Sequence, residues 1–330
     1  MGNMTLYYDA DDVKLYHGDA LDVARTLPSE SVQTIVTSPP YFGLRDYGED
    51  GQIGAEETLG EYIDRLVALF HELRRVLADD GTLWLNLGDS YAGAGYGNHD
   101  INGSAWKDAA GLDRRQGRQQ TLKKALEADG IPAKNLMGVP WRVALALQAD
   151  GWILRSDIIW AKPNPMPESV TDRPTKAHEY LFLFAKSPRY YYDTNAIRED
   201  GSPESAARYA SGYKAWGKNQ REGSQTDDRK AREYEPSIVG RNKRSVWEVA
   251  TVPFPGSHFA VYPPDLIRPC IRAGSAVGDT VLDPFSGSGT TGAVATYEGR
   301  KYIGIDLNRE YLDLSLRTRF AQPVLSWEAT

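Results

Sequence analysis

The sequence predicts an α/β protein built on a seven-stranded, mostly parallel sheet, with an irregular inserted region. Seven short apolar runs have the length and composition of strands, and several of them follow amphipathic helical patterns. Helices that alternate with strands are typical of a doubly wound parallel sheet. The length supports the same fold class, because 330 residues are enough to bury a substantial core.

The helices and strands can be placed along the chain. Apolar residues at three- and four-residue steps predict a helix over residues 58–79, with Gly81 as its cap. Residues 139–151 predict a second helix, which has Pro140 near its first turn and ends in glycine. The seven runs expected to be strands are residues 12–19, 34–38, 82–89, 153–160, 179–186, 279–285 and 301–307.

Two stretches interrupt this alternation. Residues 89–124 begin with a run rich in Gly, Ser, Asn and Asp, and we expect a long mobile loop there. Residues 187–245 carry 12 Lys and Arg against 9 Asp and Glu, although the whole chain has a net charge of −7. Long loops inside a compact domain are usually functional or disordered. We therefore expect one domain over residues 1–186 and 246–330, interrupted by a separate region over 187–245.

Composition argues against several classes of protein. The chain is 41% hydrophobic and 25% charged, with no apolar run of membrane-spanning length and no apolar signal-peptide core at its N-terminus. We expect a cytoplasmic protein without a membrane partner. The single cysteine, Cys270, excludes intrachain disulfides, and the five histidines form no closely spaced pair. No metal site is predicted.

The segment VLDPFSGSGTTG, residues 281–292, predicts a nucleoside-cofactor site. A strand ends at Asp283, and Gly287, Gly289 and Gly292 then satisfy the GxGxxG pattern before a helix. Such glycines let backbone N–H groups approach a ligand, and Asp306 at the end of the next strand could accept hydrogen bonds from ribose hydroxyls. A Rossmann dehydrogenase would use similar parts, but only about 40 residues follow Gly289. Its sheet would have almost no strands after the cofactor loop.

A permuted strand order explains the late position of this segment. We expect the strands over 279–285 and 301–307 to come first and second in the sheet, with 12–19 third and 34–38 fourth. The carboxyl ends of these neighbouring strands then carry four polar residues, Asp283, Asp306, Asp19 and Ser38. Open α/β sheets bind ligands at that rim.

The strand over 34–38 runs into TSPPY, residues 37–41, where two prolines make a stiff extended step. TSPPY, followed downstream by DPFSGSGTTG at 283–292, resembles the DNA amino-methyltransferases that use S-adenosylmethionine. The order of the two motifs is similar to that of the β group of this family. Further segments fit the family in sequence order: LYHGDAL at 15–21, RVLADDGTLWLNLGDSY at 75–91, IIWAKPNPMP at 158–167 and HFAVYPPDLI at 258–267.

The resemblance implies a Rossmann-like methyltransferase fold with circularly permuted motif order and S-adenosyl-L-methionine as the cofactor. Asp306 would hold the ribose hydroxyls, Asp19 would lie near the cofactor, and His258 would be a loop residue beside the site. The residues that the resemblance places around the methionine end are Asp283, Phe285, Gly287, Gly289, Thr290 and Thr291.

The resemblance also implies that Ser38, Pro39, Pro40 and Tyr41 are catalytic. The Ser38 hydroxyl and the Pro39 carbonyl would accept the two hydrogens of an exocyclic amino group, and the prolines would hold these acceptors still. Tyr41 would stack on a flipped-out base. In this family, serine before PPY is typical of cytosine-N4 enzymes, and an acidic or amide residue is typical of adenine-N6 enzymes. We therefore expect cytosine N4, with adenine N6 as the alternative.

Double-stranded DNA is the expected partner. Residues 187–245 lie where β-group enzymes place their target-recognition region, and residues 89–124 could close over the flipped base. Cytosine-C5 methylation would use a cysteine after proline, but Cys270 is better interpreted as a buried helix residue. A catalytically inactive DNA-binding relative is a further alternative, and a homodimer and a cognate restriction endonuclease stay open as partners.

Overall fold

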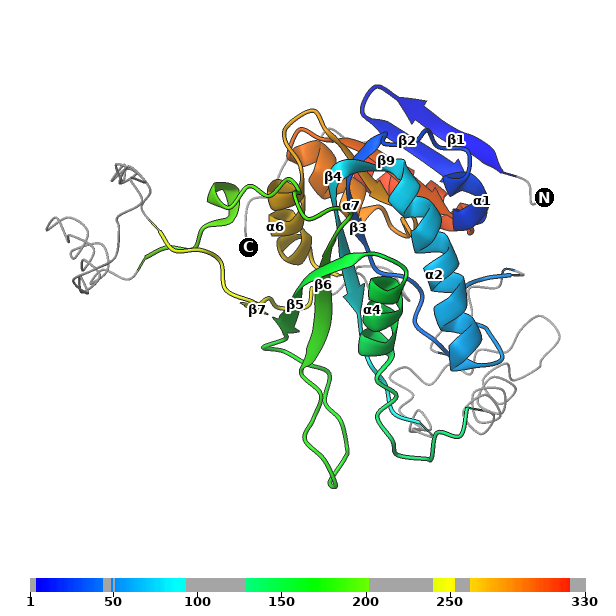
Figure 1. Ribbon diagram of the computed structural model, residues 1–330, viewed down its shortest axis with the longest axis vertical. Helices are drawn as coiled ribbons and strands as arrows, with labels where there is room; N and C mark the ends of the chain where they lie inside the picture. The colour runs from blue at the N-terminus through cyan, green and yellow to red at the C-terminus, as the bar shows by residue number, and fades with distance from the viewer. Residues whose placement is uncertain are drawn as a thin grey trace, which may run out of the picture. The chain divides into compact units, whose positions relative to one another are not determined.

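Figure 1 shows a computed structural model of the chain, which describes residues 4–43, 49, 51–92, 129–201, 240–252 and 262–320. The chain divides into two compact units, one formed by Met1–Tyr192 and Ser245–Thr330 and the other by Asp193–Arg244. Most of both irregular stretches and His258 lie outside the described residues. The expectations for those segments therefore stay predictions.

Within the described residues, a nine-stranded sheet forms the centre of the first unit, in the order β1-β2-β9-β8-β3-β4-β6-β5-β7. The strands from β2 to β4 in that order are all parallel to their neighbours, whereas β6 is antiparallel to both β4 and β5. The strands are β1 (Thr5–Ala10), β2 (Val13–His17), β3 (Val32–Thr37), β4 (Leu77–Leu87), β5 (Ile153–Ala161), β6 (His178–Ala185), β7 (Val246–Glu248), β8 (Thr280–Asp283) and β9 (Lys301–Asp306).

The predicted fold class is confirmed, and each of the seven expected strands is present. The predicted count of seven was too low, because β1 and β7 are short or largely exposed and lack an apolar run that would indicate a strand. The expected strand order was wrong, since β8 lies between β9 and β3 and β2 pairs with β9. Residues 281–283 are all buried, which suits the central position of β8, whereas β2 is buried at only two of its positions.

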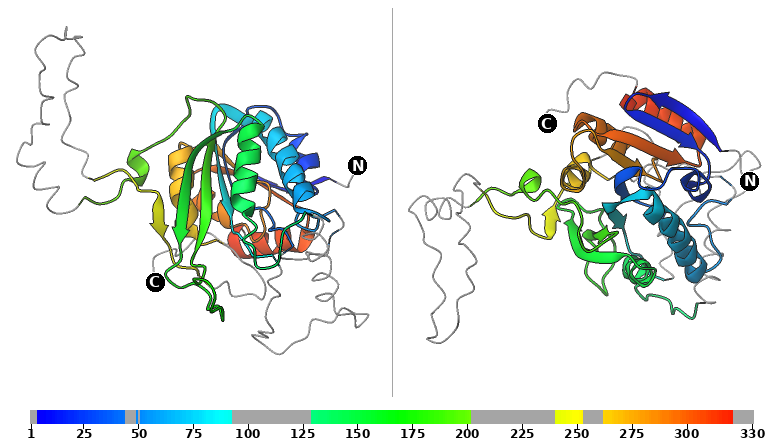
Figure 2. Two further views of the ribbon diagram at one scale, coloured as in Figure 1. Left: turned by 60° about the horizontal axis from the view of Figure 1, so that its bottom comes forward. Right: turned by 45° about the horizontal axis from the view of Figure 1, so that its top comes forward.

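Helices cover both faces of the sheet (Figure 2). On one face, α2 packs against both α1 and α4, and on the other α6 packs against α7, which also contacts η2. The described helices of the first unit are α1 (Ala20–Ala24), α2 (Leu59–Val76), α4 (Val139–Ala149), α6 (Pro264–Gly274), α7 (Thr290–Tyr297), α8 (Arg309–Ser315) and the π-helix η2 (Leu316–Phe320).

Helix α2 illustrates how local sequence sets these elements. Thr58 accepts a hydrogen bond from the Glu61 N–H, and the Glu61 carboxylate accepts one from the Thr58 N–H, which is a capping box. The helix ends at Val76 and β4 begins at the next residue, so the expected cap at Gly81 was wrong. Gly81 lies within β4, where a Cβ atom would approach the Leu77 side chain to 2.5 Å.

The carboxyl ends of the parallel strands meet at one rim of the sheet. Asp19, Asp306, Asp283 and Ser38 end or follow β2, β9, β8 and β3, as the sequence predicts. Because β6 is antiparallel to its neighbours, it brings its amino end to the same rim, and with it Glu179. The rim thus carries side chains from the carboxyl ends of parallel strands and from the amino end of an antiparallel strand.

The described part of the second unit comprises residues 193–201 and 240–244. It contains the short helix η1 (Asn195–Ile197) and a bridge between Glu199 and Arg241. The Glu199 carboxylate lies 3.0 Å from the Arg241 guanidinium and 3.4 Å from that of Arg244. Lys243 adds a third cation, 3.9 Å from the same carboxylate.

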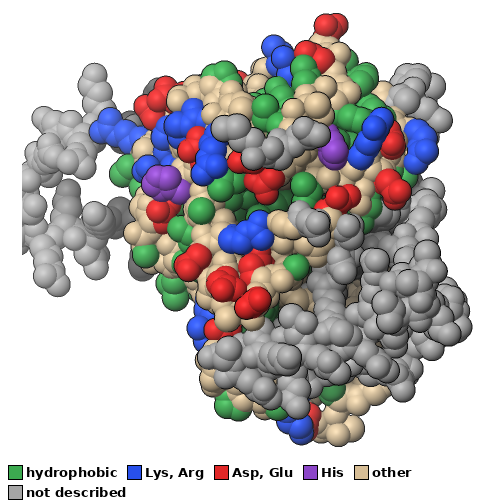
Figure 3. All heavy atoms as spheres, turned by 90° about the vertical axis from the view of Figure 1, so that its right-hand side faces the viewer, with side chains coloured by type: hydrophobic (Ala, Val, Ile, Leu, Met, Phe, Trp, Pro, Cys, Tyr) green, Lys and Arg blue, Asp and Glu red, His purple; other side chains and the backbone are tan. Residues whose placement is uncertain are grey.

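The described surface carries charges of both signs. Acidic and basic side chains are interspersed on the face shown in Figure 3. None of the described helices is long and apolar enough to cross a membrane. The same residues contain no group of three or more His, Cys, Asp or Glu side chains that could hold a metal ion.

Candidate active site

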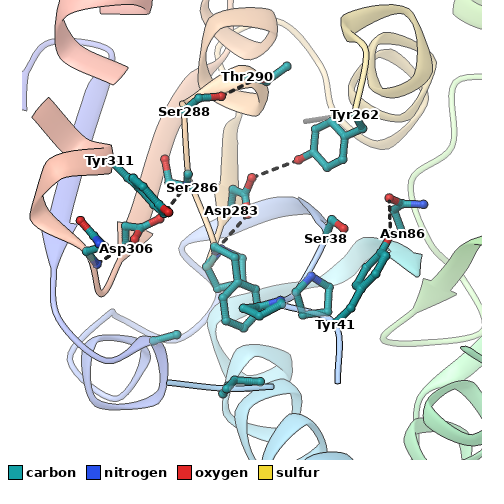
Figure 4. A pocket seen from close by; sticks show the side chains of 18 of the residues that line it. Ser38, Tyr41, Asn86, Tyr262, Asp283, Ser286, Ser288, Thr290, Asp306 and Tyr311 are labelled. Atoms are coloured by element: carbon teal, nitrogen blue, oxygen red, sulfur yellow. Dashed lines mark hydrogen bonds between the residues drawn. The ribbon is translucent and has the colours of Figure 1, made fainter. Parts of the chain in front are cut away.

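A cavity of about 500 Å³ opens at the rim of the sheet. In Figure 4, Asp306 and Tyr311 lie at one end, Tyr41 and Asn86 lie at the other, and Asp283 lies between them. We call the two ends the cofactor end and the target end. The cavity is lined by ten of the twelve predicted site residues: Asp19, Ser38, Pro39, Pro40, Tyr41, Asp283, Phe285, Gly287, Thr290 and Asp306.

Asp283 is a buried carboxylate at the centre of this cavity. Its Oδ1 accepts hydrogen bonds from the Thr37 hydroxyl at 2.7 Å and the Phe285 N–H at 3.0 Å. Its Oδ2 accepts from the Thr291 hydroxyl at 2.5 Å and the Tyr262 hydroxyl at 3.1 Å. Burial raises the pKa of Asp283, and these four hydrogen bonds oppose the rise. The carboxylate therefore joins β8, β3 and α7 at one point.

Asp306 forms the acidic wall of the cofactor end. Its Oδ2 accepts from the Gly287 N–H at 2.7 Å, and its Oδ1 accepts from the Asn308 N–H at 2.8 Å. Burial raises the pKa of Asp306 to about 7, although the two backbone hydrogen bonds oppose the rise. Each carboxylate oxygen has two lone pairs, so each keeps one acceptor position after these bonds. Two adjacent acceptors suit the two hydroxyls of a ribose, and the residues present thus fit S-adenosyl-L-methionine.

Asp19 has a structural task besides lining the cavity. It is the N-cap of α1, and its Oδ1 accepts from the N–H groups of Leu21 at 2.9 Å and Asp22 at 3.1 Å. A capping carboxylate fixes the start of a helix. Asp19 is therefore held in place at the cofactor end by its own helix.

Two predicted site residues, Gly289 and Thr291, do not line the cavity. Gly289 has φ +77° and is the N-cap of α7, and a Cβ atom there would approach the Ser315 side chain to 2.8 Å. Thr291 is buried and donates to Asp283. Gly289 suits the tight turn before α7, and Thr291 supports the Asp283 carboxylate. Their contact with a cofactor stays a prediction.

The segment Ser38–Tyr41 forms the target end. The Tyr62 hydroxyl donates to the Pro40 carbonyl at 2.9 Å, which fixes the proline step against α2. The Pro40 carbonyl thus accepts from Tyr62, and the Pro39 carbonyl is the one predicted to accept from the target amino group. The Tyr41 ring lines the same cavity wall.

Several residues of the cavity wall were missed by the sequence analysis: Asn86, Trp160, Lys162, Glu179, Tyr262, Asn308 and Tyr311. Lys162 follows β5, and Glu179 is the second residue of the antiparallel β6, whereas the predicted site residues lie at carboxyl ends of parallel strands. The available sequence signals were a lysine directly after one apolar run and a glutamate at the start of the next.

Cys270 is separate from this site. It is fully buried in α6, and its thiol donates to the Leu266 carbonyl of the same helix at 3.5 Å. It does not line the cavity. This placement agrees with its interpretation as a core residue.

Comparison with known proteins places the chain in a family. The family model described as DNA methylase, for N6 and N4 methyltransferases, matches residues 32–317. The type II methyltransferase M.Cfr9I of Citrobacter freundii is 47% identical over 302 residues, which cover 92% of this chain and 86% of that protein.

Solved structures show the same fold. The cytosine-N4-specific PvuII DNA methyltransferase matches with a TM-score of 0.64 and 19% identity, over 99% of this chain and 92% of that one. A putative DNA modification methylase of Thermus thermophilus, solved in complex with S-adenosyl-L-methionine, has a TM-score of 0.53 and 22% identity over 92% of each chain. That complex agrees with the predicted cofactor. The resemblance seen in the sequence is confirmed, and the protein belongs to the DNA methylases of the N6 and N4 amino-methyltransferase family.

Proposed function

We propose that this protein methylates the N4 amino group of cytosine in double-stranded DNA, with S-adenosyl-L-methionine as the methyl donor. The observation that carries the proposal is that Ser38 and Pro39 line the same cavity as Asp283 and Asp306. An amino group at one end and a methyl donor at the other would be neighbours in this space. A volume of about 500 Å³ is within the ordinary range of cofactor and substrate sites.

At the cofactor end, Asp306 would accept hydrogen bonds from the ribose hydroxyls, and Asp283 would face the methionine part. Gly287 has φ +51° and presents its N–H to Asp306, so the loop backbone closes on the carboxylate. Phe285 and Thr290 would complete the wall. When bound, S-adenosyl-L-methionine supplies an electrophilic methyl group on a positively charged sulfur.

At the target end, the chain makes an amino group a better nucleophile. Such a group reacts poorly because its lone pair is delocalised into the base. The Ser38 hydroxyl and the Pro39 carbonyl accept its two hydrogens, which favours a tetrahedral nitrogen with its lone pair directed at the methyl group. Preorganised acceptors lower the barrier because they need no rearrangement during the reaction. The base reaches them by leaving the duplex and stacking on Tyr41.

Ser38 is also what favours cytosine N4 over adenine N6. Serine before PPY is typical of the cytosine-N4 members of the family, and the PvuII enzyme, which has the same fold, is described as cytosine-N4-specific. Adenine N6 is the second candidate, because the same acceptors would bind an adenine amino group. Cytosine has a smaller ring system than adenine. The two products, N4-methylcytosine and N6-methyladenine, also differ in mass.

DNA recognition would fall to the region over 187–245. Its described part gathers Arg241, Lys243 and Arg244 around a single Glu199, so cations outnumber acids there. Lysine and arginine contacts to phosphates make DNA binding dependent on salt. A homodimer and a cognate restriction endonuclease stay predictions.

The proposal is tested with S-adenosyl-L-methionine carrying a labelled methyl group. The protein is incubated with methylation-free DNA prepared by amplification, and the DNA is digested to nucleosides for mass spectrometry. We expect labelled N4-methylcytosine from the natural protein and none from a reaction without protein. Labelled N6-methyladenine would select the second candidate, and unlabelled DNA would refute both.

A further inference from the structure

The Tyr41 hydroxyl is tied to a carboxylate from a distant strand. It donates to Glu179 Oε2 at 2.8 Å, and the Asn86 amide donates to the same oxygen at 3.3 Å. Asn86 also donates to the Tyr180 carbonyl at 3.0 Å, which fixes its amide beside β6. Figure 4 shows the Tyr41 hydroxyl directed toward Asn86 at the target end. Tyr41 is therefore held at its hydroxyl as well as through its backbone.

Glu179 is itself held by a cation. Lys162 Nζ lies 2.5 Å from Glu179 Oε1, and the two side chains are only 18% and 17% exposed. The ammonium also lies 4.2 Å from the centroid of the Trp160 ring. A cation over an aromatic face is attracted to it, so Lys162 has two reasons to stay in place. Lys162 thus fixes the orientation of the Glu179 carboxylate.

The strand β4 ends against the Tyr41 ring. A Cβ atom at Gly88 would lie 2.7 Å from Cε2 of Tyr41 and 3.3 Å from the Glu179 carboxyl carbon. Both separations are shorter than ordinary van der Waals contact. The glycine therefore lets the backbone approach the ring on the side next to the carboxylate, and the ring has little room to turn away.

The Tyr41 hydroxyl is buried beside the Glu179 carboxylate. Burial raises the pKa of Tyr41 well above its usual value, and the charge and hydrogen bond of Glu179 raise it further, whereas Ser38 lowers it. Tyr41 therefore keeps its proton at neutral pH and donates it to Glu179.

We propose that Glu179 is a positioning residue for methyl transfer, which fixes Tyr41 by its hydroxyl and so holds the ring on which the target base stacks beside Ser38 and Pro39. This role rests on the proposed function, because it concerns the same amino group. Glu179 acts through Tyr41 and need not touch the substrate. Glu179 therefore affects the rate of methyl transfer and leaves the cofactor end of the cavity unchanged.

The test is a double-mutant cycle on the full chain with Glu179→Ala, Tyr41→Phe and both together. Single-turnover methyl transfer is measured with saturating S-adenosyl-L-methionine on amplified, methylation-free DNA. We expect each single variant to lose about 10- to 100-fold in rate, the range typical of residues that orient a metal ligand and so act on a site indirectly. The double variant should be no slower than Tyr41→Phe, because Glu179 contributes to the rate through the Tyr41 hydroxyl, which both variants lack.

Two further variants separate positioning from folding. Glu179→Gln keeps an oxygen that can accept the Tyr41 hydrogen bond, so it should recover most of the rate. Glu298→Ala is a matched control, since Glu298 is 9% exposed and pairs with Arg272 at 2.8 Å but does not line the cavity. It should keep the natural rate. The dissociation constant for S-adenosyl-L-methionine, measured by calorimetry, should stay unchanged in the Glu179 variants.

Each outcome decides between the two proposals. Additive losses in the double variant, an unchanged rate in Glu179→Ala, or no recovery in Glu179→Gln would refute the positioning role while the natural protein still methylates DNA. A natural protein that transfers no methyl group to DNA would refute the proposed function, and the positioning role with it. Recovery together with non-additive losses would establish the role.

Discussion

The two ends of the cavity are built in different ways. At the cofactor end, Asp306 is bound by the N–H groups of Gly287 and Asn308, in loops that directly follow β8 and β9. At the target end, Tyr41 is held by Glu179, which lies 138 residues away in the chain. Backbone N–H groups thus hold Asp306 at the cofactor end, whereas a side chain holds Tyr41 at the target end. Substitutions should therefore affect cofactor affinity at one end and reaction rate at the other.

Ser38→Ala should give the largest effect. The variant lacks one of the two acceptors proposed for the target amino group, and loss of one preorganised hydrogen-bonding group typically lowers the rate by about 100- to 1,000-fold. Single-turnover methyl transfer measures this loss. Calorimetry should show an unchanged affinity for S-adenosyl-L-methionine, and a comparable loss of affinity would mean that the two ends are not separable.

Asp306→Asn should act at the opposite end. The amide offers one acceptor oxygen where the carboxylate offers two, and hydrogen bonds to charged groups are each worth about 1.5–3 kcal/mol. We expect affinity for S-adenosyl-L-methionine to fall by about 10- to 100-fold, measured by calorimetry. The transfer rate at saturating cofactor should stay near that of the natural protein. A variant that binds normally but reacts slowly would reverse our assignment of Asp306.

The pH dependence of cofactor binding sharpens the same assignment. Burial raises the pKa of Asp306 to about 7, so the carboxyl group of the free protein is mostly protonated below that pH. A ribose diol binds best to the ionised form, and binding must then release a proton. The dissociation constant should rise about tenfold for each pH unit below 7 and level off above it. Asp306→Asn, which cannot ionise there, should lose this component of the profile.

Cys270→Ala should have the smallest effect. Cys270 is buried in α6 and does not line the cavity, so the variant should methylate DNA at the natural rate. Removal of a small buried side chain should cost about 1 kcal/mol of unfolding free energy, measured by denaturant titration. Complete loss of methylation with cofactor binding preserved would instead support a cysteine nucleophile and a cytosine-C5 reaction.

The same contrast explains what could be predicted from the sequence. Asp283, Gly287 and Asp306 lie in two strand-loop-helix segments whose pattern is local, so their placement could be predicted. The partnership of Tyr41 with Glu179 could not, because it depends on β6 running antiparallel beside β4. A strand that runs antiparallel to its neighbours brings its amino end to the rim, and no local sequence pattern predicts that orientation.

The errors in the predicted fold have the same origin. The strand order depends on which long-range pairs form, and the sequence alone did not place β8 between β9 and β3. Gly289 matches the glycine pattern but does not line the cavity, and a Cβ atom there would approach the Ser315 side chain to 2.8 Å. A motif identifies the segment, and the packing around it decides which of its residues face the cavity.

The most direct measurement of the central claim is the identity of the methylated atom. The claim is that the target end holds an exocyclic amino group of cytosine beside a methyl donor at the cofactor end. Nucleoside mass spectrometry after transfer of a deuterated methyl group should show N4-methylcytosine, and Ser38→Ala should reduce its amount without changing its identity. A product methylated at N6 of adenine or at C5 of cytosine would contradict this account.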